Sequence, residues 1–394
     1  MRTIKAITSK SDAHRALICA MLSDNECKVI MDTTSKDIEA TKSCINSIKC
    51  GKEDLYCGES GSTLRFMLPV VSALGLNVKF HPEGRLPDRP LSPLYEELIR
   101  HKVVMSKQGE VPFVVKGQLT SGEFNIPGNV SSQFISGLLF ALPILSGDSE
   151  INILGDIQSE DYIKMTINTL GKFGIDIKRT DKGYFVKGNQ KYISPGRYEV
   201  EGDWSNAAFF LVAGALKEGG ISLSGLDINS IQGDKRIVEI LKDFGADVSV
   251  KEKEIIVKPG KLKGISIDAS MIPDMVPALS VIAAAADGTT NIYNAKRLRI
   301  KESDRLKTIR TVIESLGGNI EELEDGLIIK GSKSLKGGVV SSFNDHRIAM
   351  MAAVASLVCE NKVIIKDADA VNKSYPDFFK HLEMLSLDTN VERE

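Results

Sequence analysis

The sequence VVKG at residues 114–117 returns three times, each time as an apolar pair followed by lysine and a closing glycine. The later copies read FVKG at 185–188, IVKPG at 256–260 and IIKG at 328–331. Successive closing glycines are 71 or 72 residues apart, and a fixed period of this kind predicts an internal repeat. Each copy follows a helix ending in glycine and a first strand. We therefore expect each copy to be the second strand of a pair within a small α/β unit.

A second recurring feature is a polar turn that leads into a helix rich in Ala, Leu and Met. Side chains of Ser, Asp and Asn cap such helices by accepting backbone N–H bonds. The helices are apolar almost all round, which predicts that they are buried. Six such units, three per half, predict a mixed α/β fold of the α+β type with two similar domains. The expected helix starts lie near Ser11, Ser60, Ser131, Asp203, Asp274 and Asn344.

The composition of the chain limits its partners. The 394 residues, 42% of them hydrophobic, suffice for two domains with full cores. A formal net charge of −2 and 6% aromatic residues argue against nucleic acid as a partner. The longest apolar stretches, such as 277–286, are too short to span a bilayer, and the first residues lack the apolar region of a signal peptide. We expect a cytoplasmic monomer without a membrane partner.

The cysteines give no sign of a metal site. None of the six forms a CxxC pair, and no histidine cluster completes a set of metal ligands. The sequence therefore predicts free thiols, no metal and no cofactor.

Basic residues gather at the expected helix starts, namely Lys10, Arg15, Arg65 and Arg347. The start of a buried helix carries free N–H groups and the positive end of the helix dipole, so it suits phosphate. Capping within the protein explains the serines and aspartates equally well. It does not explain the basic residues, which oppose the dipole unless an anion is bound. Together they predict anion binding.

The run RLRIKESDRLK at 297–307 places many charges between an expected strand and a helix start. A solvated helix face is the usual meaning of such a run. Its position favours a site, and so many Arg and Lys without metal ligands suggest a substrate with several phosphate or carboxylate groups. Asp274 and Glu302 are then the candidates for acid–base chemistry.

In order along the chain, the motifs closely resemble those of 5-enolpyruvylshikimate-3-phosphate synthases, from Thr8 to about Phe379. The resemblance implies two domains, each of three pseudo-symmetric βαβαββ units, with the active site in the cleft between them. One domain would be 9–201 and the other 1–8 with 202–394. The motifs include SKSDAHRAL (9–17), GESGSTLR (58–65), EGDWSNAAFF (201–210), IPDMVPAL (272–279), RIKESDRL (299–306), FNDHRIAM (343–350) and KSYPDFF (373–379).

The resemblance also implies the reaction, in which the enolpyruvyl group of phosphoenolpyruvate passes to the 5-hydroxyl of shikimate 3-phosphate and phosphate is released. It makes Asp274 the base for that hydroxyl, and Glu302, with Lys10, the group that protonates phosphoenolpyruvate. It assigns phosphoenolpyruvate to Lys10, Gly61, Arg89, Gln133, Arg305, Arg347 and Lys373. It assigns shikimate 3-phosphate to Ser11, Arg15, Ser131, Ser132, Gln133, Ser159, Tyr162, Asp274 and Lys301.

Two alternatives stay open at this point. The UDP-N-acetylglucosamine enolpyruvyl transferases look similar in fold, but they carry a reactive cysteine on the loop that corresponds to residues 84–94, where this chain has none. A non-catalytic anion-binding protein of the same fold would not need the carboxylates of Asp274 and Glu302. The chain also departs from the resembled pattern, with Thr8 in place of proline before SKS and Phe66 in place of proline after Arg65.

Overall fold

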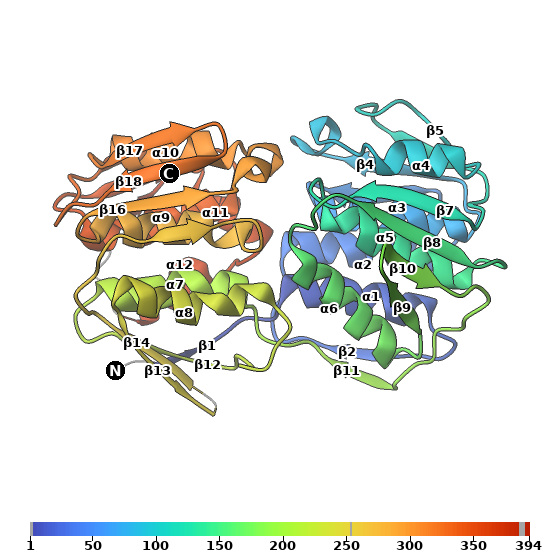
Figure 1. Cartoon of the computed structure of the whole chain (residues 1–394), viewed down its shortest axis with the longest axis horizontal. Helices are drawn as coiled ribbons and strands as arrows, with labels where there is room; N and C mark the ends of the chain where they lie inside the picture. Colours follow the sequence, from blue (N-terminus) through green and yellow to red (C-terminus); the bar gives the residue numbers. More distant parts are fainter. Residues whose placement is uncertain (1–2, 253, 386–390) are drawn as a thin grey trace. The chain divides into compact units, whose positions relative to one another are not determined.

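The computed structural model describes residues 3–252, 254–385 and 391–394. The chain divides into two compact units, which we call the 10–200 unit (Lys10–Val200) and the 201–394 unit (Met1–Ser9 with Glu201–Glu394). The chain changes unit at residues 9–10 and 200–201, each one residue from the crossing points that the sequence suggested. Figure 1 labels the helices and many of the strands of both units.

Four sheets share one topology, in which a parallel pair of strands is followed by two antiparallel neighbours. Their strand orders are β3-β4-β6-β5 and β7-β8-β10-β9 in the 10–200 unit, and β1-β12-β14-β13 and β15-β16-β18-β17 in the 201–394 unit. The third strand in each order contains the apolar pair of the repeated segment, so the predicted repeat is confirmed. These third strands are β6 (Phe113–Lys116), β10 (Gly183–Val186), β14 (Glu254–Lys258) and β18 (Gly326–Lys330).

The remaining strands of the four sheets are short. In the 10–200 unit they are β3 (Asp54–Gly58), β4 (Val78–Pro82), β5 (Val104–Met105), β7 (Glu123–Pro127), β8 (Ser149–Leu154) and β9 (Ile177–Thr180). In the 201–394 unit they are β1 (Thr3–Lys5), β12 (Ile221–Ser224), β13 (Asp247–Lys251), β15 (Ser266–Asp268), β16 (Thr289–Tyr293) and β17 (Asn319–Leu323).

Two further sheets have fewer strands than the other four. Among the described strands, β2 (Lys28–Ile30) pairs only with β11 (Arg197–Glu199), because the chain runs from β2 through a helix directly into the next sheet. The strands β19 (Gly338–Ser341), β20 (Val363–Lys366) and β21 (Val391–Arg393) are all parallel. There the C-terminal strand takes the place next to β20 that an antiparallel strand holds in the four complete sheets.

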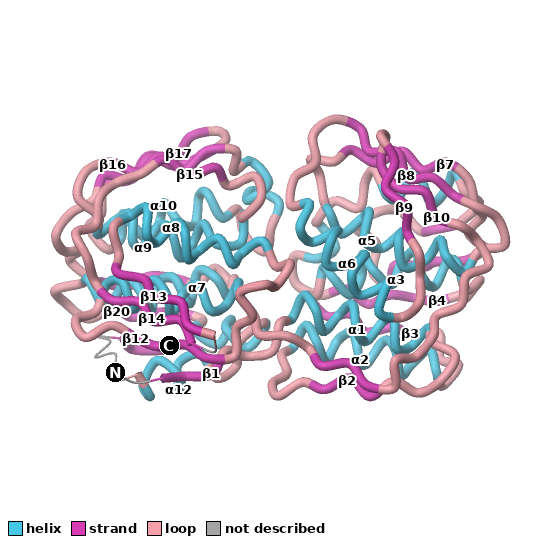
Figure 2. The backbone as a smooth tube through the Cα atoms, turned by 60° about the horizontal axis from the view of Figure 1, so that its bottom comes forward, coloured by secondary structure: helices cyan, strands magenta, loops and turns pink. Residues whose placement is uncertain are grey.

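In each unit the helices run side by side in the interior and the strands lie around them (Figure 2). The apolar helices are buried as predicted: in α7 (Trp204–Leu216) every residue but the last is buried, and in α11 (His346–Ala355) every residue is. The 10–200 unit contains α1 (Lys10–Leu22), α2 (Lys36–Lys49), α3 (Gly61–Ala73), α4 (Leu94–Arg100), α5 (Ser132–Ala141) and α6 (Glu160–Lys172). The 201–394 unit also contains α8 (Ile237–Phe244), α9 (Val276–Ala285), α10 (Arg305–Ser315) and α12 (Phe378–Met384).

The predicted helix starts are correct to within a residue in most cases. The side chains of Ser60, Ser131 and Asp203 accept backbone N–H bonds from the first turns of α3, α5 and α7. Asp345, and not Asn344, caps α11. Asp274 lies in the 3-10 turn η4 (Pro273–Met275), and α9 begins only at Val276.

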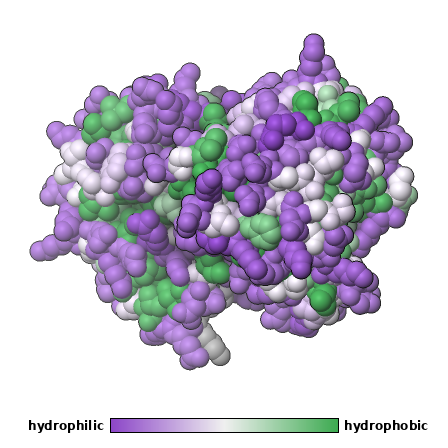
Figure 3. All heavy atoms as spheres, turned by 45° about the vertical axis from the view of Figure 1, so that its right-hand side comes forward, coloured by the Kyte–Doolittle hydropathy of each residue, from purple (hydrophilic) through white to green (hydrophobic). Residues whose placement is uncertain are grey.

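The face of the molecule shown in Figure 3 is largely polar. Purple, hydrophilic residues cover most of the face shown in Figure 3, with smaller apolar patches among them. None of the described helices is both long and apolar enough to cross a membrane.

Candidate functional site

The start of α3 carries a group of polar side chains around Gly61, which we call the Gly61 turn: Gly61, Ser62, Arg65, Arg89 and Gln133. Gln133 on α5 links this group, because its amide oxygen accepts a bond from Arg65 Nη1 (3.1 Å) and its amide nitrogen donates to Ser62 (2.9 Å). Two guanidinium groups crowd the glycine, since a Cβ at Gly61 would lie 2.6 Å from Arg65 Nη1 and 2.8 Å from Arg89 Nη1. The turn thus presents two cations at a helix start, as an anion site requires.

Lys10, the first residue of α1, lies beside an acidic partner on the neighbouring helix. Its Nζ is 2.8 Å from Oδ2 of Asp37, in the first turn of α2, and both side chains are largely buried. An ion pair that water barely reaches restricts the Lys10 side chain more than an exposed pair would. Asp37 therefore orients Lys10.

Arg15 joins α1 to α6 in the buried interior of the unit. Its Nη2 donates to the Tyr162 carbonyl (2.8 Å), and its Nε donates to Thr166 Oγ1 (2.9 Å). Burial lowers the pKa of Arg15 to about 10, so the guanidinium stays charged at neutral pH. Ser159, just before α6, has a left-handed backbone with φ 54°, a conformation that is costly for a residue other than glycine and recurs at functional sites.

His14 lies one turn into α1 and is fully buried. Its Nδ1 is 2.7 Å from Thr41 Oγ1 on α2. Burial lowers the pKa of His14 from 6.5 to about 3; Asp37 opposes this shift, whereas Lys10 and Arg15 reinforce it. The imidazole is therefore neutral at any pH at which the protein is expected to work.

This lowered pKa predicts a specific loss of stability in acid. Below pH 6.5 the unfolded chain binds a proton at His14 that the folded chain does not, so the free energy of unfolding falls as the pH falls toward 3. The slope approaches about 1.4 kcal/mol per pH unit. Between about pH 7.5 and about pH 5 we expect the wild type to lose about 2 kcal/mol more than His14→Asn, which keeps a donor near Nδ1 but does not titrate. Urea unfolding at both pH values measures this; equal losses would mean that His14 protonates within the fold.

In the 201–394 unit, the guanidinium of Arg305 at the start of α10 is completely buried among carboxylates. Its Nε is 2.8 Å from Asp345 Oδ2, its Nη1 2.8 Å from Asp274 Oδ1 and its Nη2 2.8 Å from Glu302 Oε2. We call these four residues the Arg305 cluster. An anionic ligand that contacts Arg305 has to replace one of these carboxylates. The cluster also holds the two predicted acid–base residues, Asp274 and Glu302, on one guanidinium.

Two further cations reach Asp274. Lys301 Nζ is 3.4 Å from Asp274 Oδ1, and Arg347 Nη1 donates to the Asp274 backbone carbonyl at 3.0 Å. Arg347 Nη2 also donates to Ser205 Oγ at 2.7 Å, which ties the start of α11 to that of α7. Lys373 is buried at the end of the 3-10 helix η7 (Ala368–Lys373). The predicted residues of this unit thus lie at the starts or ends of its short helices.

Burial and the charges around Asp274 shift the pKa values of Asp274 and of two neighbours, Lys301 and Asp234. Burial opposes ionisation of Asp274, but the surrounding cations outweigh it and hold its pKa well below its usual range. Burial lowers the pKa of Lys301 to about 8, although Asp274 opposes the shift. Burial, with Asp274 nearby, raises the pKa of Asp234 to about 6. At neutral pH Asp274 is therefore a carboxylate and Lys301 is mainly charged.

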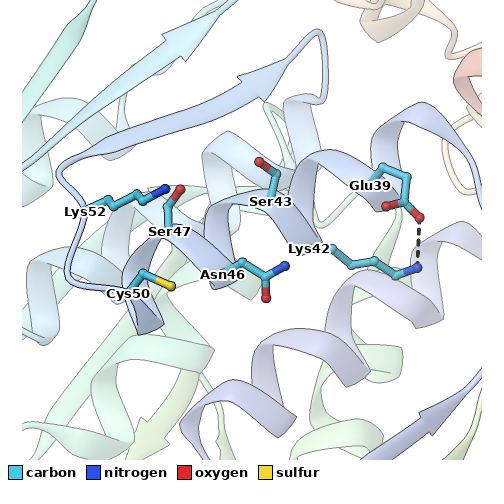
Figure 4. Close-up of a pocket in the computed structure, with 7 residues that line it drawn as sticks. All are labelled: Glu39, Lys42, Ser43, Asn46, Ser47, Cys50 and Lys52. Carbon is cyan, nitrogen blue, oxygen red and sulfur yellow. Dashed lines mark hydrogen bonds and ion pairs between the residues drawn. The ribbon is translucent and has the colours of Figure 1, made fainter.

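One shallow pocket lies outside these groups, along the exposed side of α2 (Figure 4). Its side chains come from one helix and the turn that follows it, and Lys42 is already paired with Glu39 at 2.9 Å. None of the predicted site residues lines this pocket, so we assign it no role. Among the described residues, no group of three or more His, Cys, Asp or Glu could hold a metal ion.

Comparison with known proteins decides the family. The family described as EPSP synthase (3-phosphoshikimate 1-carboxyvinyltransferase) matches residues 34–382. The chain belongs to the EPSP synthase family. Relatives named 3-phosphoshikimate 1-carboxyvinyltransferase include one from Clostridium acetobutylicum, 47% identical over 98% of this chain and 95% of its own length. Another, from Clostridioides difficile, is 42% identical over 97% of this chain and 94% of its own length.

A solved structure gives the same answer for the fold. The EPSP synthase of Acinetobacter baumannii superimposes with a TM-score of 0.80 at 25% identity, covering 97% of this chain and 95% of that chain. The resemblance inferred from the motifs and the mixed α/β fold class are thereby confirmed. These relatives carry the name of the shikimate enzyme and give no support to the UDP-N-acetylglucosamine alternative.

Sequence reasoning missed the acidic and hydroxyl partners of the EPSP synthase motifs. Asp37 holds Lys10, Asp345 holds Arg305 and Ser205 holds Arg347. Two of these three lay within quoted motifs, Asp345 in FNDHRIAM and Ser205 in EGDWSNAAFF. A basic residue expected to be buried requires a nearby carboxylate or hydroxyl, and that rule would have directed the search to them.

Proposed function

We propose that this protein transfers the enolpyruvyl group of phosphoenolpyruvate to the 5-hydroxyl of shikimate 3-phosphate and releases phosphate. Family membership supports this reaction, and the Arg305 cluster is the observation that carries it. Asp274 and Glu302 are held on one buried guanidinium, with Lys301 and Arg347 beside them. A site that only binds anions has no use for two carboxylates among its cations, whereas acid–base chemistry on anionic substrates needs both charges.

The chemistry divides between the two carboxylates. Glu302 gives a proton to the methylene carbon of phosphoenolpyruvate, which makes the neighbouring carbon cationic. The substrate hydroxyl attacks that carbon while Asp274 accepts its proton, and a tetrahedral adduct forms. Loss of phosphate, with return of a methyl proton to Glu302, leaves the enol ether, and the proton held by Asp274 departs with the phosphate. The cations stabilise the negative charge of the carboxylate and of the departing phosphate.

Substrate binding itself prepares Asp274 for its role. With its pKa held far below the usual range, the free carboxylate is a weak base. Anionic substrates that draw the charge of Lys301 and Arg347 toward themselves weaken that hold, so the pKa of Asp274 rises when the substrates are bound. The base would thus become effective only in the loaded enzyme.

The remaining assignments complete the proposal. The ligand sets are those that the family resemblance implies. In the 10–200 unit, the Gly61 turn and Lys10 bind phosphoenolpyruvate, and Arg15 binds shikimate 3-phosphate. The protein acts as a cytoplasmic monomer without a nucleic-acid partner.

The deciding experiment measures inorganic phosphate after mixing the protein with its substrates. We expect release only when phosphoenolpyruvate and shikimate 3-phosphate are both present. Release when UDP-N-acetylglucosamine replaces the shikimate compound would overturn the assignment, as would no release with the full pair.

Gly61→Ala is expected to weaken phosphoenolpyruvate binding. The added methyl carbon would lie 2.6 Å from one guanidinium nitrogen and 2.8 Å from another, so Arg65 and Arg89 must move. Because these two arginine side chains are displaced from the proposed binding site, we expect the KM for phosphoenolpyruvate to rise roughly tenfold. In the resembled family, glyphosate competes for this site and is the longer molecule, so its inhibition should fall further than substrate binding does.

Inhibition by glyphosate is measured against phosphoenolpyruvate for both proteins. The matched control is Gly171→Ala in α6, where an added Cβ meets nothing within 4 Å. We expect this control to behave as the wild type. If Gly61→Ala folds normally and leaves both constants unchanged, the Gly61 turn does not contact the ligand.

A further inference from the structure

A continuous chain of buried hydrogen bonds runs from α1, which begins at Lys10, through α2 to α3, which begins at Gly61. His14 Nδ1 on α1 lies 2.7 Å from Thr41 Oγ1 on α2, and Thr41 Oγ1 lies 2.7 Å from Thr63 Oγ1 on α3. Thr63 Oγ1 then donates to Ser60 Oγ at 2.8 Å. All four side chains are essentially inaccessible to solvent. Thr41 is the one member that connects α1 to α3.

The proton count gives this chain a single direction. Thr63 has one hydroxyl proton, which it donates to Ser60 Oγ or to the Asp37 carbonyl, so the Thr41 hydroxyl must donate to Thr63. Thr41 then has only lone pairs left for His14, so the imidazole proton sits on Nδ1. The other ring nitrogen, Nε2, is buried and has no hydrogen-bond partner among the described residues, which fits a neutral ring with a bare Nε2.

The hydrogen-bond chain ends at Ser60, the residue just before the Gly61 turn. Ser60 caps α3 and immediately precedes Gly61; its Oγ also accepts the Thr63 backbone N–H at 3.2 Å. At the other end, Thr41 lies one turn after Asp37, the residue that holds Lys10. Thr63 Oγ1 is in addition 3.5 Å from the Asp37 carbonyl. The first two turns of α2 therefore contact the starts of both α1 and α3.

We propose that Thr41 is a positioning residue that fixes the Gly61 turn relative to Lys10, and so sets the geometry of phosphoenolpyruvate binding. This inference rests on the proposed function for its ligand, but the hydrogen-bond chain itself does not. Thr41 touches no substrate and acts through Thr63 and Ser60 on one side and through α2 on the other. If these hydroxyls only completed one another's hydrogen bonds in the core, their loss would lower the stability of the fold and would change the KM values for the two substrates equally.

The test compares Thr41→Val, which has the same shape without the hydroxyl, with Thr41→Ser, which keeps it. Thr41→Val leaves a buried imidazole N–H without an acceptor, so the starts of α1 and α3 shift to relieve it. We expect the KM for phosphoenolpyruvate to rise roughly fivefold or more, and the KM for shikimate 3-phosphate to change by less than about twofold. Thr41→Ser should restore the wild-type value.

The matched control is Thr169→Val in α6, another buried threonine whose hydroxyl donates to a carbonyl of its own helix. It should leave both KM values unchanged. Equal rises in both KM values for Thr41→Val, or an unchanged KM for phosphoenolpyruvate, would overturn the inference.

Two measurements do not depend on activity. Amide hydrogen exchange of residues 61–64 should be faster in Thr41→Val than in the wild type and in Thr41→Ser. Nitrogen-15 NMR of the wild type should show His14 as the Nδ1–H tautomer, and an Nε2–H tautomer would contradict the chain even if Thr41→Val does not fold. A wild type that releases no phosphate refutes the proposed function, whereas unchanged exchange in Thr41→Val refutes the positioning role.

Discussion

Glu302→Gln is expected to lower kcat by roughly 10²–10⁴-fold, the range typical of a general acid or base. Glutamine keeps the size of the side chain, and its amide oxygen can still accept the bond from Arg305 Nη2 that Glu302 accepts at 2.8 Å. It cannot deliver a proton to the methylene carbon of phosphoenolpyruvate. Binding of shikimate 3-phosphate, measured by calorimetry, should remain within about threefold of the wild type, because that ligand is not assigned to Glu302.

The control for this change is Glu322→Gln in the same unit. Glu322 also accepts arginine bonds, from Arg299 at 2.7 Å and Arg310 at 3.0 Å, but belongs to none of the proposed ligand sets. It should retain near wild-type turnover. A parallel loss of shikimate 3-phosphate binding and of kcat in Glu302→Gln would show that Glu302 supports the fold of the site and does not supply the proton.

The repeat was the most predictable part of the fold, because short stretches of consecutive residues are enough to indicate it. The apolar–Lys–Gly step marked the third strand of all four complete sheets, and buried helices followed from their unbroken apolar runs. The two small sheets were not predictable in this way. The pairing of β2 with β11 joins residues far apart in the chain, and the parallel pairing of β21 with β20 depends on where a C-terminal segment returns.

In the candidate site, too, local features were predictable from the sequence and contacts between distant residues were not. Basic residues at helix starts were visible in the sequence, since capping residues and charges lie next to one another there. Their partners are distant: Asp345 lies 40 residues from Arg305, and Ser205 lies 142 residues from Arg347. Local patterns do not encode such pairs. The role of the Thr41 hydroxyl could not be predicted from the sequence either, because a threonine on an amphipathic helix does not by itself indicate a buried hydrogen bond.

Asp274→Ala is expected to reduce both turnover and substrate binding. Loss of the base predicts a fall of roughly 10²–10⁴-fold in kcat. In addition, the fully buried Arg305 loses the carboxylate at its Nη1, and Lys301 loses its acidic neighbour. Removing one partner of a buried ion pair typically costs about 3–5 kcal/mol, so this variant should also unfold more easily. Its KM for shikimate 3-phosphate should rise, because Asp274 is proposed to touch the substrate hydroxyl.

Asp274→Asn separates the chemical role from the structural one. Its amide oxygen can still accept from Arg305, so stability should recover, but an amide cannot take the hydroxyl proton and kcat should stay low. Asp268→Asn, at the end of β15, removes a carboxylate outside the cluster and should change neither quantity. Steady-state kinetics and urea unfolding on the three variants distinguish the roles. Near wild-type turnover in a folded Asp274→Asn would show that another group accepts the proton. In that case Asp274, whose pKa its neighbouring cations hold well below the usual range, would be a permanently ionised carboxylate that holds Lys301 and Arg305 in place.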